Sequence, residues 1–527
     1  VPAPTRPRSP RSRRRRVPWA SIAPVATLAL ALSVTAPAAA APATSRAAET
    51  PEEPLPSTAP PSAAPVLRPT SPSAPPSGPA EEATPEGPAE AEEDGKKGKR
   101  GKRGKKGEKE GDAPAKEKKP ERLEFGGLPA TNYDSDLGVG FGAIATLAKF
   151  HPGYRPYRWR VQMLLYATAK RGPKGVELPY HEDYINVDVP GLLDNRLRIN
   201  GNIGFKKFST TGYYGIGNGS LSLKPWEMID KEADPEAFAI ARRYNQYDRI
   251  FPGFDVNARI RAWDRSIEAH RRRLEVFVGT YFSYNVIRPY ESSKLTEDIE
   301  AAKADTPDGH ALDHLLNGTG NHAMWRINLG LVWDTRDHEF VPTRGTFTEV
   351  STRVSPGVDD KLYHAGFTVN TSWYKSLVGS YLVFATRAVG DVLVGNVPFW
   401  ELTRFGALLS RDGPGGSWSV RGVPRQRFSG KAKFVSNVEL RSEFLPFRIK
   451  GQRFMLGAIA FVDTGRVWAD IKPTIINGQN VDRGGLAVGV GGGLRVRWGE
   501  TFLVRVDPSY SITEDNFGIY IDIGHIF

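Results

Sequence analysis

The chain has 527 residues, no cysteine and a formal net charge of +12 at pH 7. The absence of cysteine from this sequence excludes disulfides, thiolate metal ligands, a cysteine nucleophile and a lipid-modified cysteine within it. Residues 121–527 hold 50 basic and 45 acidic side chains, so they give no electrostatic reason to expect nucleic-acid binding.

Residues 1–41 predict a signal peptide for secretion. Four consecutive arginines, Arg13 to Arg16, precede an apolar run from Val17 to Ala41 that ends in small residues. A positive start, an apolar middle and a small-residue exit are typical of a cleaved signal peptide. Pro18 and Pro24 disfavour the alternative, a permanent membrane anchor. In a bacterium we therefore expect export to the periplasm or the outer membrane.

Residues 42–120 predict a disordered periplasmic arm. Residues 1–120 hold 23 of the 42 prolines and a single aromatic residue, Trp19, so they have little to bury. The arm is first rich in proline, alanine and glutamate, and residues 96–109 then carry nine basic side chains spaced by glycines. This basic part either meets lipid phosphates or the cell-wall layer, or serves only as a solubilising linker.

Residues 121–527 predict an all-β transmembrane barrel. Trp325, Ile327 and Leu329 alternate with Arg326 and Asn328, and similar long stretches recur to the end of the chain. A soluble β-sandwich also alternates, but its strands average five or six residues. The mean hydropathy of −0.40 and the lack of 18-residue apolar segments after the signal exclude helical spans. A closed barrel is then the membrane structure that pairs every backbone group.

The alternation predicts a sixteen-stranded antiparallel β-barrel in the bacterial outer membrane. Two long connections, 288–322 and 394–431, interrupt it. The long segment 210–238 falls on the side where short turns belong, so the pairing of the first six strands stays open. Gly138, Gly140 and Gly142 in the first expected strand, with Gly518 and Gly524 in the last, predict a weak closing seam. The expected strands are 134–150, 156–169, 178–189, 195–209, 239–250, 253–263, 272–287, 323–336, 345–356, 361–375, 380–393, 432–445, 454–468, 484–498, 501–513 and 517–527.

Three motifs in this region resemble those of one family. The turn that holds Asp334, Arg336 and Asp337 is followed by Pro342 and Gly345. Val420-Arg421-Gly422 lies in the second long connection, and Phe461-Val462-Asp463-Thr464-Gly465 lies in a strand. In combination they resemble the BamA/TamA-type surface-antigen barrels, which include outer-membrane assembly and two-partner-secretion barrels. The resemblance implies assistance to the insertion or translocation of protein, or of lipid, at the outer membrane.

The sequence departs from this family in two places. Family members that insert or secrete proteins carry periplasmic POTRA domains, and residues 42–120 have no aromatic side chain from which to build one. Val423 stands where the loop tip of the family usually has Phe or Tyr. The first departure favours the alternative function, a POTRA-less passive pore or structural barrel without insertase activity.

Arg421 predicts a lock that holds the second long connection inside the barrel. A charge at the tip of an inward-folded loop is costly unless it is paired. Asp463 follows the alternation of Ala458, Ala460 and Val462 onto the opposite, lumenal face, and a guanidinium–carboxylate pair there could be bidentate. We expect Arg421 and Gly422 at the tip, Asp463 as the first partner and Glu439 as the second.

No motif predicts an enzyme, a metal site or a cofactor. The glycine run from Gly489 to Gly493 is similar to a phosphate loop but lies within an alternating strand. We expect a monomer surrounded by outer-membrane lipid, with unfolded outer-membrane protein clients or a periplasmic accessory protein as further partners and no nucleic acid. Phe527 is expected to close the last strand as a C-terminal barrel signal.

Overall fold

The structure is a computed structural model that describes residues 121–527, apart from 135–136, 152–153, 155–156, 173–174, 266–271, 360, 407, 409, 450–451 and 499–501. The predicted signal peptide and arm lie outside the described residues, so those two expectations stay predictions.

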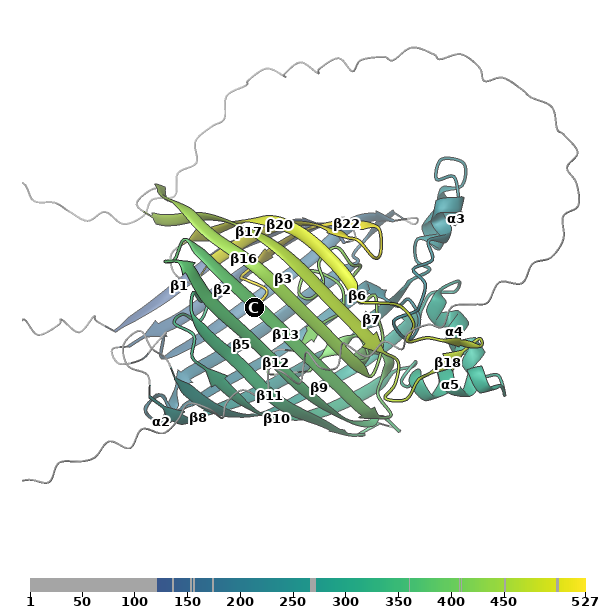
Figure 1. Ribbon diagram of the computed structural model, residues 1–527, viewed down its shortest axis with the longest axis horizontal. Coiled ribbons are helices and arrows are strands. Elements are labelled where there is room, and N and C mark those ends of the chain that lie inside the picture. Colours follow the sequence, from purple (N-terminus) through teal and green to yellow (C-terminus); the bar gives the residue numbers. More distant parts are fainter. Residues whose placement is uncertain are drawn as a thin grey trace, which may run out of the picture. The chain divides into compact units, whose positions relative to one another are not determined.

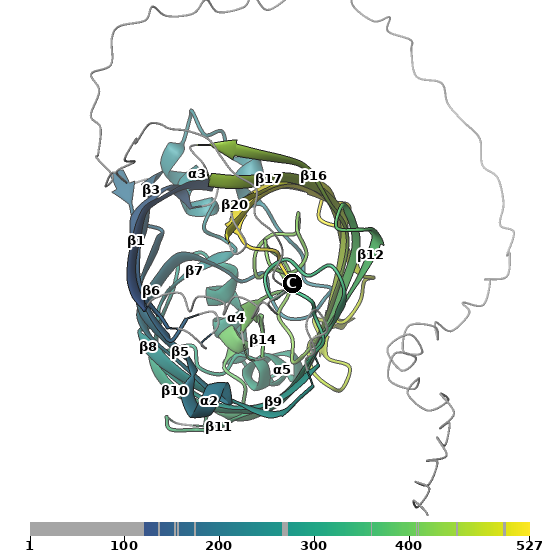
Figure 2. The ribbon, with the colours of Figure 1, turned by 90° about the vertical axis from the view of Figure 1, so that its left-hand side faces the viewer.

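One antiparallel sheet of eighteen strands curls into a barrel (Figures 1 and 2). Successive long strands run up and down the wall, and each pairs with the next long strand along the chain. The strands are β1 (Arg122–Asp134), β2 (Gly138–Phe150), β3 (Trp159–Gly172), β4 (Gly175–Glu177), β5 (Tyr180–Gly191), β6 (Leu197–Gly212), β7 (Gln246–Ile250), β8 (Gly253–Asp264), β9 (Arg273–Pro289), β10 (His322–Asp334), β11 (Gly345–Pro356), β12 (Tyr363–Val378), β13 (Leu382–Gly395), β16 (Ala432–Ile449), β17 (Gln452–Trp468), β20 (Ala487–Trp498), β21 (Phe502–Ser511) and β22 (Asn516–Ile523).

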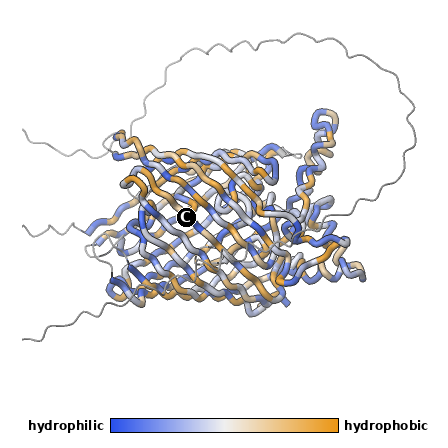
Figure 3. Tube along the Cα trace, in the orientation of Figure 1, coloured by the Kyte–Doolittle hydropathy of each residue, from blue (hydrophilic) through white to orange (hydrophobic). Residues whose placement is uncertain are grey.

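The barrel wall is apolar outside and polar inside, as the alternation predicts. In β10 the outward side chains Ile327 and Leu329 are 41% and 52% exposed, whereas Arg326 and Asn328 are buried in the lumen. Figure 3 shows hydrophobic and hydrophilic residues alternating along the tilted strands. A sheet with its large apolar side chains facing outward is stable in lipid, because lipid replaces the protein core.

The sheet has eighteen strands rather than the expected sixteen because β1 and β4 are added to the expected set. β7 and β8 both pair with β6 and with β9, so together they occupy one position in the wall. β4 has three residues and pairs only with β3. The all-β barrel itself is confirmed.

The start of the barrel differs from the expectation in two places. β1 pairs with β2 along its whole length and is the first strand, whereas the expected first strand began at residue 134. The expected strand 239–250 is wrong, since α3 (Pro235–Ala241) occupies its first part and only β7 remains. Asp234 caps α3 by accepting a hydrogen bond from the Ala237 amide, and Pro235 opens its first turn. Connections alternate between the two ends of an antiparallel barrel. With β1 counted as the first strand, the segment 213–245 lies at the same end as the other long connections.

Three long connections cover one end of the barrel (Figure 1). They are 213–245, 290–321 and 396–431, and their buried apolar side chains, among them Tyr213 and Trp400, form a common core. None of the helices in the described part of the chain is long and apolar enough to cross a bilayer. The elements in these three and in the other connections of the wall are α2 (Leu192–Asn195), η1 (Pro225–Met228), α3, α4 (Lys294–Ala302), α5 (Pro307–Leu315), η2 (Phe399–Glu401), β14 (Arg404–Phe405), β15 (Arg411–Asp412), β18 (Ile475–Ile476) and β19 (Gln479–Asn480).

The chain leaves the wall after β22, so Phe527 does not complete the last strand as expected. Gly524 has a φ of +86°, a value that turns the backbone and that glycine tolerates best. Ile526 is buried, and the Phe527 ring lies in the lumen against the guanidinium groups of Arg387 and Arg441. Figure 2 shows this end of the chain inside the ring of strands.

The seam of the barrel lies between β1 and β22. The two strands approach each other, but within the described residues they share no paired register. Gly138, Gly140 and Gly142 are not at the seam, because they belong to β2. All three pair with β1, and Gly140 and Gly142 also pair with β3. Gly518 is in β22 and pairs with Ser509 on its other side.

Candidate functional site

The connection 396–431 folds back from the barrel mouth into the lumen. β14 and β15 form a small hairpin within it, and the segment that follows descends to a tip at Val420-Arg421-Gly422. Val420, Arg421 and Val423 are fully buried. We call this connection the lumenal loop. The lumenal loop occupies space inside the barrel that would otherwise be filled by water.

Asp463 of β17 holds the tip through a single carboxylate. The Arg421 backbone amide and Nε both donate to Asp463 Oδ2, at 3.1 and 2.7 Å, and Nη2 donates to Oδ1 at 3.0 Å. Nη2 also donates to Glu439 Oε1 of β16 at 2.7 Å. The guanidinium lies 3.4 Å from the centre of the Phe461 ring. The structure therefore brings together the three charged residues that the sequence singles out.

Glycines allow the tip to approach the wall this closely. Gly422 has a φ of +89°, and a Cβ there would lie 2.6 Å from the Ser511 amide nitrogen. Its own amide donates to the Tyr520 hydroxyl, and its carbonyl accepts from Asn516 Nδ2 at 2.7 Å. A Cβ at Gly489 would lie 1.9 Å from the Arg421 carbonyl oxygen. Gly489, the first glycine of the run in β20, thus leaves the space that the loop tip occupies.

A third carboxylate, Asp507 of β21, completes the site and is not among the residues singled out from the sequence. Asp507 Oδ2 accepts from Arg421 Nη1 at 3.2 Å and from Arg505 Nη1 at 2.9 Å. Its Oδ1 accepts from Arg495 Nη1 at 2.5 Å. Arg495 and Arg505 both fall on the inward face of their strands. The inward positions of these two arginines in the alternating pattern indicate that the lumen needs a further carboxylate, but they do not identify Asp507.

Backbone carbonyls of the lumenal loop also accept hydrogen bonds from side chains of the barrel wall. The carbonyls of Ser417, Trp418 and Ser419 accept hydrogen bonds from Arg505, Arg387 and Asn437, respectively. These side chains come from β21, β13 and β16, so the descending segment is held from three strands.

Two further ion clusters anchor the loop above its tip. Asp391 of β13 binds Arg353 at 2.7 Å and Lys433 at 3.1 Å, and it accepts from the Gly406 amide. Nearer the mouth, Glu401 of η2 accepts from Arg326 Nη1 at 3.2 Å. Burial alone would raise the pKa of Glu401, but the guanidinium groups of Arg326 and Arg404 lower it to about 2.

The family-type turn 335–344 lies at the opposite end of the barrel from the long connections. Arg336 Nε and Nη2 donate to the two oxygens of Asp334, at 2.9 and 3.2 Å. Asp337 accepts from the backbone amides of His338, Thr343 and Arg344. Asp334, Arg336 and Asp337 therefore shape this turn and do not reach the loop tip. Among the described residues there is no group of three potential metal ligands.

One protein family and several solved structures are similar to this chain. Residues 190–527 match the Omp85 superfamily domain. Among solved structures, BamA from Haemophilus ducreyi lacking POTRA domains 1–3 is similar at 15% identity and a TM-score of 0.44, over 77% of this chain and 70% of that chain. CdiB from Escherichia coli is similar at 11% identity and a TM-score of 0.46, over 76% of this chain and 62% of that chain. No curated protein matches the sequence.

The fold and the loop-filled lumen define a transmembrane β-barrel of the bacterial outer membrane. The chain belongs to the Omp85 superfamily. This superfamily includes barrels that insert proteins into the outer membrane or move them across it, and the resemblance to BamA/TamA-type barrels is confirmed.

Proposed function

We propose that this barrel assists the insertion or translocation of protein, or of lipid, at the outer membrane, and that the lumenal loop is locked in place by Arg421. The lock consists of Arg421 and Gly422 at the tip, Asp463 as the principal acceptor and Glu439 as the second. Its clients are unfolded outer-membrane proteins, with a periplasmic accessory protein to deliver them. The barrel acts as a monomer, without a cofactor and without enzymatic chemistry.

The seam between β1 and β22 is the observation that carries this proposal. Every other pair of neighbouring positions in the wall is joined by antiparallel pairing, whereas these two strands have no paired residues within the described part of the chain. Unpaired edges are templates for another strand. A client strand could therefore add to β1 or β22 at low cost, because few backbone hydrogen bonds would have to break.

The loop tip supports the same function because it is bound to the strands beside the seam. Gly422 contacts Tyr520 and Asn516 at β22, and Arg421 contacts Asp507 of the adjoining β21. If the seam opens, the loop lock is a nearby element that must adjust to the movement of the last two strands.

Disulfide locking of the seam tests the proposal. Because this sequence contains no cysteine, pairs can be scanned between β1 residues 122–127 and β22 residues 517–522, keeping those that crosslink on oxidation. The matched control joins Val350 of β11 to Val369 of β12, which face each other in a fixed register. Each variant replaces the native protein in cells, and the outer-membrane proteome is measured with and without reductant.

The expected result is loss of a set of outer-membrane proteins in the oxidised seam variants, with recovery on reduction and no loss in the control. An unchanged proteome in a fully crosslinked seam variant would contradict the proposal that client strands enter the membrane through the seam between β1 and β22. If depletion of the whole protein also leaves the proteome unchanged, the alternative function holds, namely a passive pore or structural barrel without insertase activity.

A further inference from the structure

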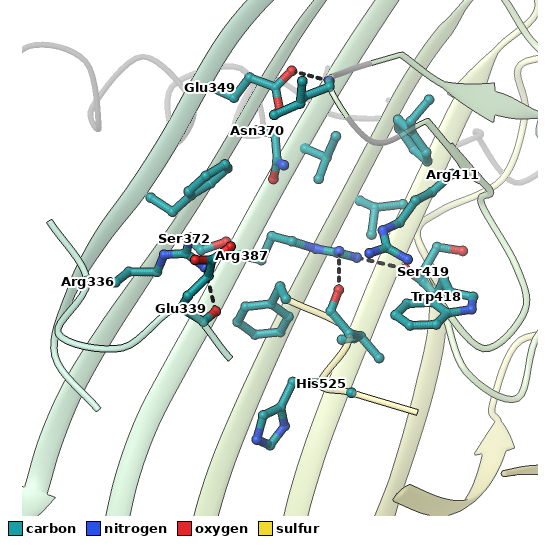
Figure 4. A pocket seen from close by; sticks show the side chains of 18 of the residues that line it. Arg336, Glu339, Glu349, Asn370, Ser372, Arg387, Arg411, Trp418, Ser419 and His525 are labelled. Atoms are coloured by element: carbon teal, nitrogen blue, oxygen red, sulfur yellow. Dashed lines mark hydrogen bonds between the residues drawn. The ribbon is translucent and has the colours of Figure 1, made fainter. Parts of the chain in front are cut away.

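A cavity of about 410 Å³ lies in the lumen beside the lumenal loop. Its walls include Trp418 and Phe405 of the loop, Phe340 of the turn 335–344, and Phe527 (Figure 4). The turn and the residues after β22 belong to the end of the barrel with the short connections, which in outer-membrane barrels faces the periplasm. The cavity therefore lies between the loop and the periplasmic mouth, and a molecule of moderate size would fit.

Two arginines in the cavity wall have no carboxylate partner among the described residues. Arg387 donates to Asn437 Oδ1 and to the carbonyls of Ile526 and Trp418, which are all neutral acceptors. The Arg411 guanidinium stacks 4.1 Å from the centre of the Trp418 ring. Figure 4 shows these two guanidinium groups pointing toward each other. Burial and the nearby Arg505 lower the pKa of Arg411 to about 10, so it remains charged at neutral pH.

The acidic side chains in the cavity wall are engaged elsewhere. Glu349 accepts from the Leu408 amide and from Ser351, and Asp412 is paired with Arg425 at 2.6 Å. Glu339 lies 3.8 Å from Arg198, across the lumen. Burial, with Arg441 nearby, lowers the pKa of His525 well below its ordinary value, so this ring is neutral. No carboxylate of the described residues forms a hydrogen bond or an ion pair with Arg387 or Arg411, but Asp522 acts electrostatically on Arg411, and Asp463 and Glu439 act on Arg387. The cavity wall therefore presents two close positive charges without a direct counter-ion.

Two like charges in a partly dry cavity repel each other, and an anion between them relieves the repulsion. The rest of the wall is mainly apolar and aromatic, and it includes Tyr374, Val389 and Leu503. A free inorganic anion would leave that surface against water, whereas a neutral apolar molecule would leave both arginines without a counter-charge.

We propose that the cavity binds an anionic amphiphile with a single short alkyl chain, whose phosphate or carboxylate head lies between Arg387 and Arg411 and whose chain contacts the aromatic wall. Because Arg387 also binds the Trp418 carbonyl, the occupant would lie against the segment of the lumenal loop just before its tip. The lumenal loop forms part of this site, but Arg421, Asp463 and Glu439 of the lock do not line it.

Calorimetric titration of the full-length protein in nanodiscs tests the proposal. The probes are octyl phosphate and octanoate, with octanol and inorganic phosphate as the comparisons that lack one of the two features. Titrations into empty nanodiscs are subtracted, because alkyl probes also enter lipid. Arg411→Gln removes the cation that stacks on the Trp418 ring, and Arg483→Gln removes an equal charge from an exposed position outside the cavity.

We expect saturable binding of octyl phosphate or octanoate at one site per protein, and at least tenfold weaker binding to Arg411→Gln, which is about 1.4 kcal/mol. Arg483→Gln should bind as the native protein does. Preference for octyl phosphate identifies the occupant as a phospholipid-type head, and preference for octanoate identifies a fatty acid.

The proposal fails if octanol or inorganic phosphate binds as tightly as the octyl anions, or if Arg411→Gln leaves their affinity unchanged. Folding of each variant is checked by the mobility shift between unheated and heated samples in gel electrophoresis. Arg387→Gln gives a second, independent loss of affinity if it folds.

Discussion

Arg421 and Asp463 are joined by three hydrogen bonds, one from the Arg421 backbone amide and two from its guanidinium. A single carboxylate thus fixes both the position of the loop backbone and the direction of its side chain. Both residues are fully buried, so water does not compete for these contacts. The pair joins segments 42 residues apart in the sequence, and through it the lumenal loop depends on β17.

The first prediction concerns the loss of this arginine. Arg421→Ala leaves Asp463, Glu439 and Asp507 without one of their cations in a buried site, which should cost about 3–5 kcal/mol of stability. The loop tip should leave the lumen, so the single-channel conductance in a planar bilayer should rise. Arg421→Lys keeps the charge but loses the bidentate fork, and an intermediate conductance is expected. A native conductance in Arg421→Ala would contradict the lock.

The second prediction concerns Asp507, which contacts three arginines from two strands and the loop. Asp507→Asn removes the charge but keeps the shape, so Arg421, Arg495 and Arg505 lose a common counter-ion. We expect a lower unfolding temperature and a higher conductance. The control is Asp522→Asn, because Asp522 binds only Arg505 among these arginines and is 30% exposed at its side chain. Equal effects of the two substitutions would mean that Asp507 contributes only through Arg505.

The alternating pattern predicted most of the wall, because each inward or outward position follows directly from the pleat. It failed where the pattern was short or interrupted. In β1, Gly126, Gly127 and Pro129 break the alternation that Leu123 and Phe125 begin. In 239–250, the apolar residues of α3 and β7 lie close enough in sequence to resemble one strand.

The loop site could be predicted only in part. Arg421 and Asp463 belong to motifs of a known family, and the alternation gives the face on which Asp463 lies. Asp507 belongs to no such motif, and its role depends on how Arg495 and Arg505 meet across β20 and β21, which sequence alone does not specify. The cavity beside Arg411 is formed by the path of the loop and by residues 524–527, so it required the folded structure.

The third prediction concerns acid. The pKa of Glu401 in the folded protein is about 2, below the ordinary value of 4.5, because Arg326 and Arg404 outweigh its burial. A lowered pKa means that Glu401 stabilises the fold above pH 4.5 and that this stabilisation is lost as the pH falls from 4.5 to about 2. We expect Glu401→Gln to lower the unfolding temperature by a constant amount between pH 7 and 5, with a free-energy cost on the order of 3 kcal/mol. The difference between variant and native protein should shrink below pH 4.5, whereas a difference that grows on acidification would contradict the assignment.

The fourth prediction separates the shape of the loop site from its charge. Gly489 of β20 faces the loop tip, and a Cβ there would lie 1.9 Å from the Arg421 carbonyl oxygen and 3.5 Å from Val420. Since no contact between heavy atoms is tolerated at 1.9 Å, Gly489→Ala must push the tip away while every charged group is retained. Displacement of the tip lengthens the hydrogen bonds to Asp463, so the conductance should rise as it does in Arg421→Ala, with a smaller loss of stability because no charge is removed. The matched control is Gly390→Ala in β13, where an added Cβ meets nothing within 4 Å. Conductance is recorded for both variants in the same lipid and salt, and combining Gly489→Ala with Arg421→Ala should add little to the conductance of either single variant. If the two increases in conductance add fully, Gly489 and Arg421 act on different parts of the lumen. The space at Gly489 would then not be required for the contact between Arg421 and Asp463.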